Sequence, residues 1–515
     1  MTIAYATFDI LADFGSGPVS IGADVFAVRT PISANWGATA CDPLTRIATT
    51  GQFIFTLNNS EYNSASKLGY YSPGNSNLRA GFGLETPVVL KVTYGGVSKY
   101  KRFYISQITP VPGTVGTRQT DIVAADFMGR LATQNITSLA VQVNKRTDQA
   151  LATLIALLPT APLATAFSVS PETQDYLFTD ITDGTAFMTA VQHLALTDAG
   201  YIFVKGDASG GETLCYETRQ ERQLRTSALT LNGTMTDLSM PINENQLLND
   251  ITASVFPGSV GAVAETLYQS PKEILVRAGG TVTFQVNYTD PNQGQGSQST
   301  VVLLPGSGVA PVSGTDYKVT ATSGSGLNDA TASLTVGVAW NAPYAVVTLT
   351  NLSNSFDVFV NPFNLRGQII RLYNKQDVRV LEPSAPNLAK YGDRPLSYPM
   401  YYQSNINFAN DMANHWFSMW HLPASVPQYI EFIANNDTTQ MAAAVSLDIG
   451  SRFTAVETVT GISADYCIVG IDMTIESGSK LTVRYYVEPV NLLPMCILDD
   501  AYFDILDSPQ CLVGF

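Results

Sequence analysis

Three histidines, His193, His415 and His421, are the first candidates for acid–base or metal chemistry in this chain. Two metal ligands on one helix must be three or four residues apart to lie on the same face. His415 and His421 are six residues apart, and they flank Trp416 and Trp420. We therefore interpret both as packing or interface residues. His193 lies near the apolar stripe of another expected helix, and we interpret it as a core or rim residue.

Two pairs of aspartates could perform glycoside hydrolysis, which uses two carboxyl groups on either side of the cleaved bond. The pairs are Asp180 with Asp183 and Asp499 with Asp500. A simpler interpretation is that Asp180 and Asp183 cap a helix beginning near Gly184, and that the second pair belongs to a C-terminal tail. The sequence contains no Gly-x-Ser-x-Gly motif for a nucleophilic serine. We predict that the protein is not an enzyme and has no catalytic, cofactor-binding or metal site.

No Cys-x-x-Cys pair occurs, and the five cysteines are scattered along the chain: Cys41, Cys215, Cys467, Cys496 and Cys511. Their odd number and spacing predict neither a zinc site nor a disulfide framework, and favour assembly in a reducing cytoplasm. The start of the chain, residues 1–5, has no basic residue and no long apolar run, so we expect no signal peptide. The most apolar region, residues 151–167, is interrupted by Pro159 and Pro162 and falls short of a membrane span.

The overall charge argues against binding to nucleic acid. The chain has 515 residues and a formal net charge of −15, and only 14% of its residues are charged. Proteins that bind nucleic acid neutralise phosphates with clustered Lys and Arg. The nearest such cluster here, Arg219, Arg222 and Arg225, is diluted by Glu217 and Glu221. A polar, weakly charged surface of this kind suits a protein that is covered by its neighbours in an assembly.

The element that organises the N-terminal region is a strand expected at 51–59. Phe53, Phe55 and Leu57 alternate along it and predict one buried face. Asn58 and Asn59 then end the strand, because Asn tolerates turn conformations and bonds its own backbone. A Tyr-Ser-Pro-Gly loop at 71–74 follows, and a hairpin is expected from 87–94 and 100–108 across two glycines.

Later segments predict helices and further strands. Asp126 is a candidate N-cap for a short helical turn. Apolar positions at helical spacing predict helices at 147–158, 184–199 and 405–421. A hairpin is expected from 201–204 and 213–216, and Gly, Ser, Thr and Asn become frequent from 262 to 365, where short strands alternate with turns.

In their order and spacing, these motifs resemble bacteriophage tail-tip proteins, the baseplate-hub or minor tail proteins of long-tailed phages. The residues that carry the family motif are structural ones: Phe53, Phe55, Thr56, Leu57, Asn58, Asn59, Ser72, Pro73, Asp126, Gly129, Leu131, Asn249, Tyr391 and Gly392. One departure is Ile105, which stands where the family usually has a glycine. The resemblance covers most of the chain except residues 262–365.

The resemblance implies a mainly β fold with a smaller α/β part, built from tube-like β-barrel domains and an inserted β-sandwich. The expected parts are an N-terminal tube-like domain at 1–112, an α/β hub domain at 113–220, strands returning to the first barrel at 221–261, the inserted sandwich at 262–365, a second barrel-like hub domain at 366–490 and a C-terminal tail at 491–515.

The same resemblance implies a structural virion protein. In the family, three copies form a ring with a pseudo-sixfold face that closes the tail tube and gives passage to the tape-measure protein and DNA. It implies a homotrimer at the phage tail tip that contacts a tail-tube or distal tail protein, the tape measure and fibres. DNA would pass through without specific binding. Whether the chain is the hub or a neighbouring distal tail protein stays open.

Other classes of function remain open at this point. The segment 262–365 could recognise a glycan or protein of the host surface, which would make the chain a receptor-binding tail protein. A tail-associated cell-wall hydrolase is a further alternative, against which the missing catalytic constellation argues. A secreted β-rich adhesin would share the composition but should carry a signal peptide.

Overall fold

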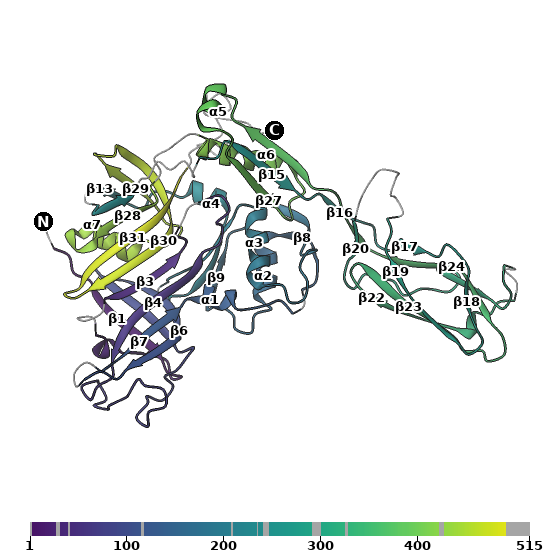
Figure 1. The fold of residues 1–515 in the computed structure, drawn as a ribbon, viewed down its shortest axis with the longest axis horizontal. Helices are drawn as coiled ribbons and strands as arrows, with labels where there is room; N and C mark the ends of the chain where they lie inside the picture. Colours follow the sequence, from purple (N-terminus) through teal and green to yellow (C-terminus); the bar gives the residue numbers. More distant parts are fainter. Residues whose placement is uncertain are drawn as a thin grey trace.

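The computed structural model describes residues 3–26, 31–39, 42–114, 118–137, 139–207, 210–233, 235–239, 247–290, 300–324, 328–421 and 427–490. The protein is mainly β with a smaller α/β part, as the sequence predicts. Figure 1 shows a body that contains the large sheet and the helices, and a sandwich that projects from it. None of the described helices is long and apolar enough to cross a membrane.

A sheet of 13 strands dominates the body. Its strands are β1 (Thr7–Asp13), β2 (Pro18–Ser20), β3 (Ile32–Gly37), β4 (Thr49–Asn58), β5 (Pro87–Tyr94), β6 (Val97–Val111), β7 (Gln119–Ala125), β13 (Thr230–Asn232), β14 (Asp237–Ser239), β28 (Tyr429–Ile433), β29 (Arg452–Glu457), β30 (Ile462–Glu476) and β31 (Lys480–Pro489). The predicted strand at 51–59 is β4, and the predicted hairpin is β5 with β6.

The N-terminal and C-terminal strands join edge to edge in this sheet. β3 pairs with β4 on one side and with β30 on the other, from Ile32 opposite Ile475 to Gly37 opposite Gly470. A Cβ atom on Gly470 would lie 2.1 Å from the carbonyl oxygen of Ala38, and Gly37 has a φ of +93°. Glycine is therefore required at this pair, because the two backbones approach too closely for a side chain.

The expectation of separate tube-like barrels needs correction. The described strands form one continuous path from β14 through β28, β31, β30, β3, β4, β7, β6, β5 and β1 to β2, and β29 and β13 branch from β30. Among the described strands, neither half closes on itself by strand pairing, although an isolated bridge joins Val25 to Leu57 of β4. The physical reason is that β3 uses both of its edges, one for each half, so the two halves share a strand instead of closing separately.

The α/β unit follows β7. It contains α1 (Phe127–Ala132), β8 (Gln142–Arg146), α2 (Thr147–Ile155), β9 (Ala164–Phe167), β10 (Thr173–Leu177), α3 (Phe187–Thr197), β11 (Tyr201–Lys205), β12 (Thr213–Glu217) and α4 (Arg219–Leu224). The predicted hairpin is confirmed as β11 with β12, and β9 pairs parallel to β12. Buried side chains of α2 and α3 belong to the same core as those of the large sheet.

A peripheral layer is built from segments that precede and follow the projecting sandwich in the sequence. β15 (Asp250–Val255) lies between β26 (Gln376–Leu381) and β27 (Pro395–Met400), with α5 (Ala385–Tyr391) between the last two in sequence. The helix that the sequence predicts at 405–421 is α6 (Ile406–Trp420), which packs on this sheet.

Two expected groupings of segments differ from this arrangement. Residues 221–261, expected to return to the first barrel, contribute β13 and β14 to the C-terminal strands β29 and β28, and β15 to the peripheral layer. Residues 366–490, expected as one barrel-like domain, divide between the peripheral layer and the large sheet. The peripheral sheet has its own core, because β15 and α6 bury apolar faces against each other.

The projecting sandwich has a separate hydrophobic core, whose buried members come from residues 267–369. Its strands are β16 (Gly258–Val260), β17 (Glu265–Gln269), β18 (Ile274–Val276), β19 (Thr281–Asn287), β20 (Thr300–Leu303), β21 (Tyr317–Thr320), β22 (Leu334–Trp340), β23 (Tyr344–Asn351), β24 (Val358–Gly367) and β25 (Ile369–Leu372). β16 and β25 connect it to the body as an antiparallel pair (Figure 1).

Candidate functional site

His193 on α3 contacts one aspartate and two tyrosines. Its Nδ1 lies 2.7 Å from Oδ2 of Asp180, and its ring stacks on that of Tyr401 with centroids 3.6 Å apart. The Tyr402 hydroxyl donates to the other Asp180 oxygen at 2.7 Å. Burial opposes ionisation of Asp180, but the hydrogen bonds from His193 and Tyr402 prevail and lower its pKa. His193 is therefore a packing residue that holds α3 against the segment after β27.

The prediction that Asp180 and Asp183 cap α3 is wrong. Ala186 occupies the N-cap position, and no side chain there accepts a hydrogen bond from the helix. The contacts of Asp180 with Tyr402 and His193 take its carboxylate away from the helix end. Asp499 and Asp500 lie outside the described residues.

The two histidines of α6 also make packing contacts. His415 is 7% exposed, and its ring centroid lies 4.7 Å from that of Trp416. Burial, together with the nearby guanidiniums of Arg219 and Arg46, lowers the pKa of His415 well below its usual range. His421 donates a hydrogen bond from Nδ1 to the Phe417 carbonyl oxygen. Within the described ranges, no three His, Cys, Asp or Glu side chains gather as a metal site.

The motif residues after β4 hold a long loop against the large sheet. Phe53, Phe55 and Leu57 are fully buried, while the Asn58 carboxamide accepts from the backbone N–H of Ser60. Asn59 accepts from the Tyr71 N–H at 2.8 Å and donates to the Ser72 hydroxyl at 2.6 Å.

Two further motif residues of this region differ in environment. The Thr56 hydroxyl donates to Asp121 on β7 at 2.8 Å, and Pro73 is exposed at the tip of the loop. The loop also has a buried centre, because Asp24 accepts from the Tyr71 hydroxyl at 2.5 Å and from the Ser64 N–H at 2.6 Å. The asparagines and Asp24 therefore satisfy the backbone of a loop that has little regular structure.

Asp126 is a buried helix cap, as the sequence predicts. Its carboxylate accepts from the Met128 N–H of α1 at 3.1 Å and from the Gly51 N–H of β4 at 2.9 Å. Lys101 Nζ lies 3.5 Å from the same carboxylate and donates to the Val204 carbonyl oxygen at 2.8 Å. Asp126 thus joins β4, β6 and α1, and Lys101 extends this contact to β11.

The remaining motif residues of this helix and of the peripheral layer are also structural. Gly129 leaves room for Thr50, whose Cγ2 would lie 2.9 Å from an added Cβ, and Leu131 is buried. Asn249, before β15, donates to the Gly392 carbonyl oxygen at 2.8 Å and accepts from the Arg394 N–H at 2.7 Å. The turn after Tyr391, where Gly392 has a φ of +68°, is thereby fastened to β15.

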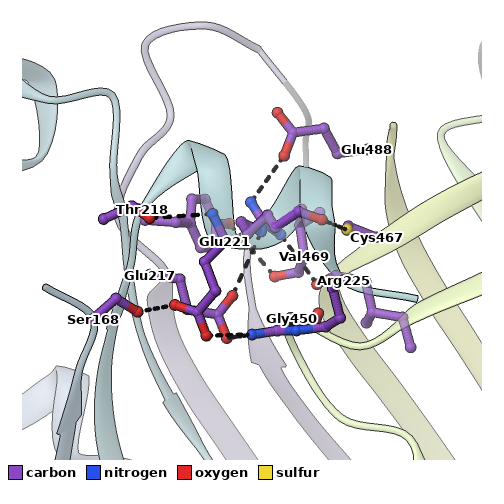
Figure 2. A network of polar contacts seen from close by, with 12 residues as sticks. Ser168, Glu217, Thr218, Glu221, Arg225, Gly450, Cys467, Val469 and Glu488 are labelled. Atoms are coloured by element: carbon purple, nitrogen blue, oxygen red, sulfur yellow. Dashed lines mark hydrogen bonds and ion pairs between the residues drawn. The ribbon is translucent and has the colours of Figure 1, made fainter. Parts of the chain in front are cut away.

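A polar network joins the α/β unit to the C-terminal strands through α4, as Figure 2 shows. Arg225 donates to Glu217 and to Glu221 at 3.0 Å each and to the Gly450 carbonyl oxygen. Thr218 caps α4 by accepting from the Glu221 N–H at 3.2 Å. These contacts fix the short helix against the turn before β29.

Arg222 lies on the buried side of α4. It donates to Glu488 on β31 at 2.9 Å and to the Ile468 carbonyl oxygen on β30 at 3.4 Å. Arg46 also donates to Glu488, at 3.3 Å, and its guanidinium lies 4.8 Å from the centroid of the Trp416 ring. Burial opposes ionisation of Glu488, yet Arg46 and Arg222 together lower its pKa. One carboxylate thus connects the N-terminal region, α4 and β31.

Two of the arginines of 219–225 are engaged within the chain. Arg222 is 6% exposed, and Arg225 is paired with two glutamates. The network also uses Arg46 and Glu488, which the sequence does not single out. No sequence pattern points to this pair, because the two residues are 442 positions apart.

The comparisons with known proteins found no matching family model and no matching curated protein. Among solved structures, the chain is similar to the 43 kDa tail protein of prophage MuSo2 from Shewanella oneidensis, with a TM-score of 0.47, 10% identity, and coverage of 94% of this chain and 99% of the other. A tail protein from Neisseria meningitidis MC58 gives a TM-score of 0.46 and 10% identity over 93% and 96% of the two chains. The prophage tail protein gp18 of Listeria monocytogenes EGD-e gives a TM-score of 0.41 and 11% identity over 94% and 96%.

Proposed function

We propose that this protein is a structural component of a phage tail, the hub at the tail tip, and that three copies form a ring. The resemblance of the sequence motifs to those of tail-tip proteins supports this proposal. The observation that carries it is the edge-to-edge union of the N-terminal and C-terminal strands through β3. One copy contributes two β units side by side, so three copies would supply the six units that a pseudo-sixfold ring needs.

In this proposal, the ends of the large sheet are the contacts between copies. β2 is exposed along its length and forms one end of the path, and β14 forms the other. Edge strands offer unpaired backbone groups to a neighbouring chain. The ring would contact a tail-tube or distal tail protein, the tape measure and fibres, within the virion at the tail tip.

The proposed ring would let DNA pass without holding it. The chain has 43 acidic and 28 basic side chains. Buried pairs such as Arg222 with Glu488 and Lys101 with Asp126 use basic groups that would otherwise be free to bind phosphate.

Mass and symmetry measurements test the proposal. Light scattering of the purified chain should give about three times 55.3 kDa, and images of assembled particles should show threefold copies at the tail tip. A strict monomer at high concentration, together with a position in particles that lacks threefold symmetry, would refute the ring. Retention of double-stranded DNA in a salt-sensitive gel shift would refute the passive channel.

A second candidate function, recognition of a host glycan or protein, is favoured by the projecting sandwich. It has its own core and extends away from the body (Figure 1). An open groove of about 420 Å³ is lined by polar side chains that include Glu273, Lys318 and Asn361. Binding of the full chain to host cell surfaces should disappear when residues 262–365 are removed. Equal binding by both proteins would exclude this function.

A further inference from the structure

The strand β22 lies at an open edge of the projecting sandwich (Figure 1). The described strands of its sheet follow the order β19, β23 and β22, so β22 is paired on one side only. Just after β22, the Asn341 N–H donates to the Tyr344 carbonyl oxygen on the β23 side at 2.9 Å. Residues that bond to the neighbouring strand alternate with residues that do not in an antiparallel pair. Val336 and Val338 therefore direct their backbone groups to the open edge.

The sequence of β22 lacks the features that block strand addition at other edges of this protein. Natural edge strands carry charged residues or proline, which discourage pairing with another chain. The two edges of the peripheral sheet follow this rule, since β26 contains Asp377 and Arg379 and β27 contains two prolines. The seven residues of β22 include no charged residue and no proline. Val336 and Val338 are only partly buried against the core of the sandwich, so an added strand would cover them.

The glycine at the centre of β22 is not explained by contacts within the described chain. A Cβ atom on Gly337 would have the Thr348 carbonyl oxygen as its nearest contact, at 3.8 Å, which is an ordinary van der Waals distance. Gly337 is also not among the glycines with a positive φ. A glycine inside a strand weakens it and often marks a place where another backbone approaches closely. We therefore relate Gly337 to the approach of a strand at the open edge.

We propose that β22 pairs with β22 of a second copy of this chain, antiparallel and about a twofold axis at Gly337. In this register Val336 of each copy faces Val338 of the other, and their free backbone groups bond to each other. The two glycines face each other at a non-hydrogen-bonded position, where opposite Cα atoms are only about 4.5 Å apart. Thr335 faces Ala339, and no like charges meet because the strand has none.

This pairing would join two three-stranded sheets into one of six strands. Seven residues from each copy are fewer than the roughly 20–30 per partner of a standard interface, so the pairing needs concentrated chains. Its twofold symmetry differs from that of a threefold ring, so it would connect one ring, or one free chain, to another. The inference does not depend on the proposed tail function.

Sedimentation equilibrium of the full chain over a range of concentrations tests the pairing. The mass of the unsubstituted protein should double as the concentration rises, from one chain to two or from three chains to six. Gly337→Lys should weaken this step roughly tenfold or more, because two lysines would lie directly opposite each other. The matched control is Thr283→Lys on β19, which places the same charge in the same row of the sheet, since Thr283 and Gly337 both pair with Thr348. The control should keep the doubling.

A mixture of two variants gives a second measurement. Gly337→Glu alone should also pair weakly, but mixing it with Gly337→Lys should restore the doubling, because opposite charges would then face each other. Hydrogen exchange of peptides that cover β22 should slow with concentration in the unsubstituted protein and not in Gly337→Lys.

Three results would overturn the pairing: a mass that never doubles, equal doubling by Gly337→Lys, or a mixture that stays unpaired. A threefold mass that never doubles would leave the ring intact, whereas a single chain that doubles to two would refute the ring and support the pairing.

Discussion

Replacing Asp126 by alanine should weaken the centre of the large sheet far more than the loss of a helix cap alone. Asp126 and Lys101 are each 1% exposed, and the lysine ammonium lies 3.5 Å from the carboxylate. The substitution removes the cap of α1 and the acceptor of the Gly51 N–H. It also leaves the Lys101 charge buried, with the Val204 carbonyl oxygen as its remaining hydrogen-bond acceptor.

The expected magnitude follows from these two losses. An Asp N-cap replaced by alanine costs about 1 kcal/mol. Removing one partner of a buried ion pair costs about 3–5 kcal/mol, because the other charge stays in a poorly solvated site. The Val204 carbonyl oxygen still solvates the ammonium, so the lower end applies. We expect Asp126→Ala to reduce the free energy of unfolding of this region by about 4 kcal/mol.

Asp437→Ala is the matched control. Asp437 caps α7 (Thr438–Ser446) by accepting from the Gln440 N–H at 2.9 Å, and no lysine or arginine pairs with it among the described contacts. The control should cost about 1 kcal/mol, the value for a cap alone. Hydrogen exchange is the assay, measured on peptides that cover β4 and β7 for Asp126→Ala and on peptides that cover α7 for the control, because it reports local opening in a chain with several cores.

Two results would refute this reasoning. If Asp126→Ala lowers the free energy of unfolding no more than Asp437→Ala does, the buried ion pair contributes nothing beyond the helix cap. The second concerns Asp126→Ala combined with Lys101→Met, which removes the stranded charge and should recover most of the difference from the control. A double variant that is less stable than Asp126→Ala would show that Lys101 acts mainly through Val204.

Three further predictions use other parts of the fold. Burial raises the pKa of Asp198 to about 6 from the ordinary 3.8. The stability that this group contributes is therefore full below pH 3.8 and is lost, by about 3 kcal/mol, as the pH rises through 6. Asp198→Asn should flatten this pH dependence of the free energy of unfolding, measured from pH 4 to 7. Deleting 262–365 with a short Gly-Ser join should leave a soluble protein that unfolds cooperatively, because Gly261 already bonds to Ile369 at 2.7 Å; aggregated product would contradict this. Gly470→Ala should lower the free energy of unfolding by about 1–3 kcal/mol or more and increase hydrogen exchange in β3. Protection of β3 equal to that in the unsubstituted protein would contradict the close approach to Ala38.

The local structure was predictable wherever it depends on neighbouring residues. The alternation of Phe53, Phe55 and Leu57 predicts β4, because every second side chain of a strand shares a face. The cap at Asp126 and the helix α6 follow from equally local signals.

The arrangement of these elements was not predictable in the same way. β3 pairs with β30 across more than four hundred residues, and its own sequence does not show which strand fills its second edge. The same limitation applies to Asp180, which local spacing assigns to a helix cap but which accepts from Tyr402, 222 residues away. A distant partner with a better donor overrides the local preference, because the carboxylate is partly buried and needs strong hydrogen bonds.

The distribution of charge connects the fold to the proposed assembly. In a chain with few charged residues, buried pairs occur where segments meet: Glu488 with two arginines at α4, and Lys101 with Asp126 between β6 and α1. Replacing such pairs by apolar groups is often neutral for stability, so their value lies in fixing which surfaces meet. They use basic groups of a chain whose formal net charge is −15. A hub that must align several units, yet release the DNA passing through it, would need both properties.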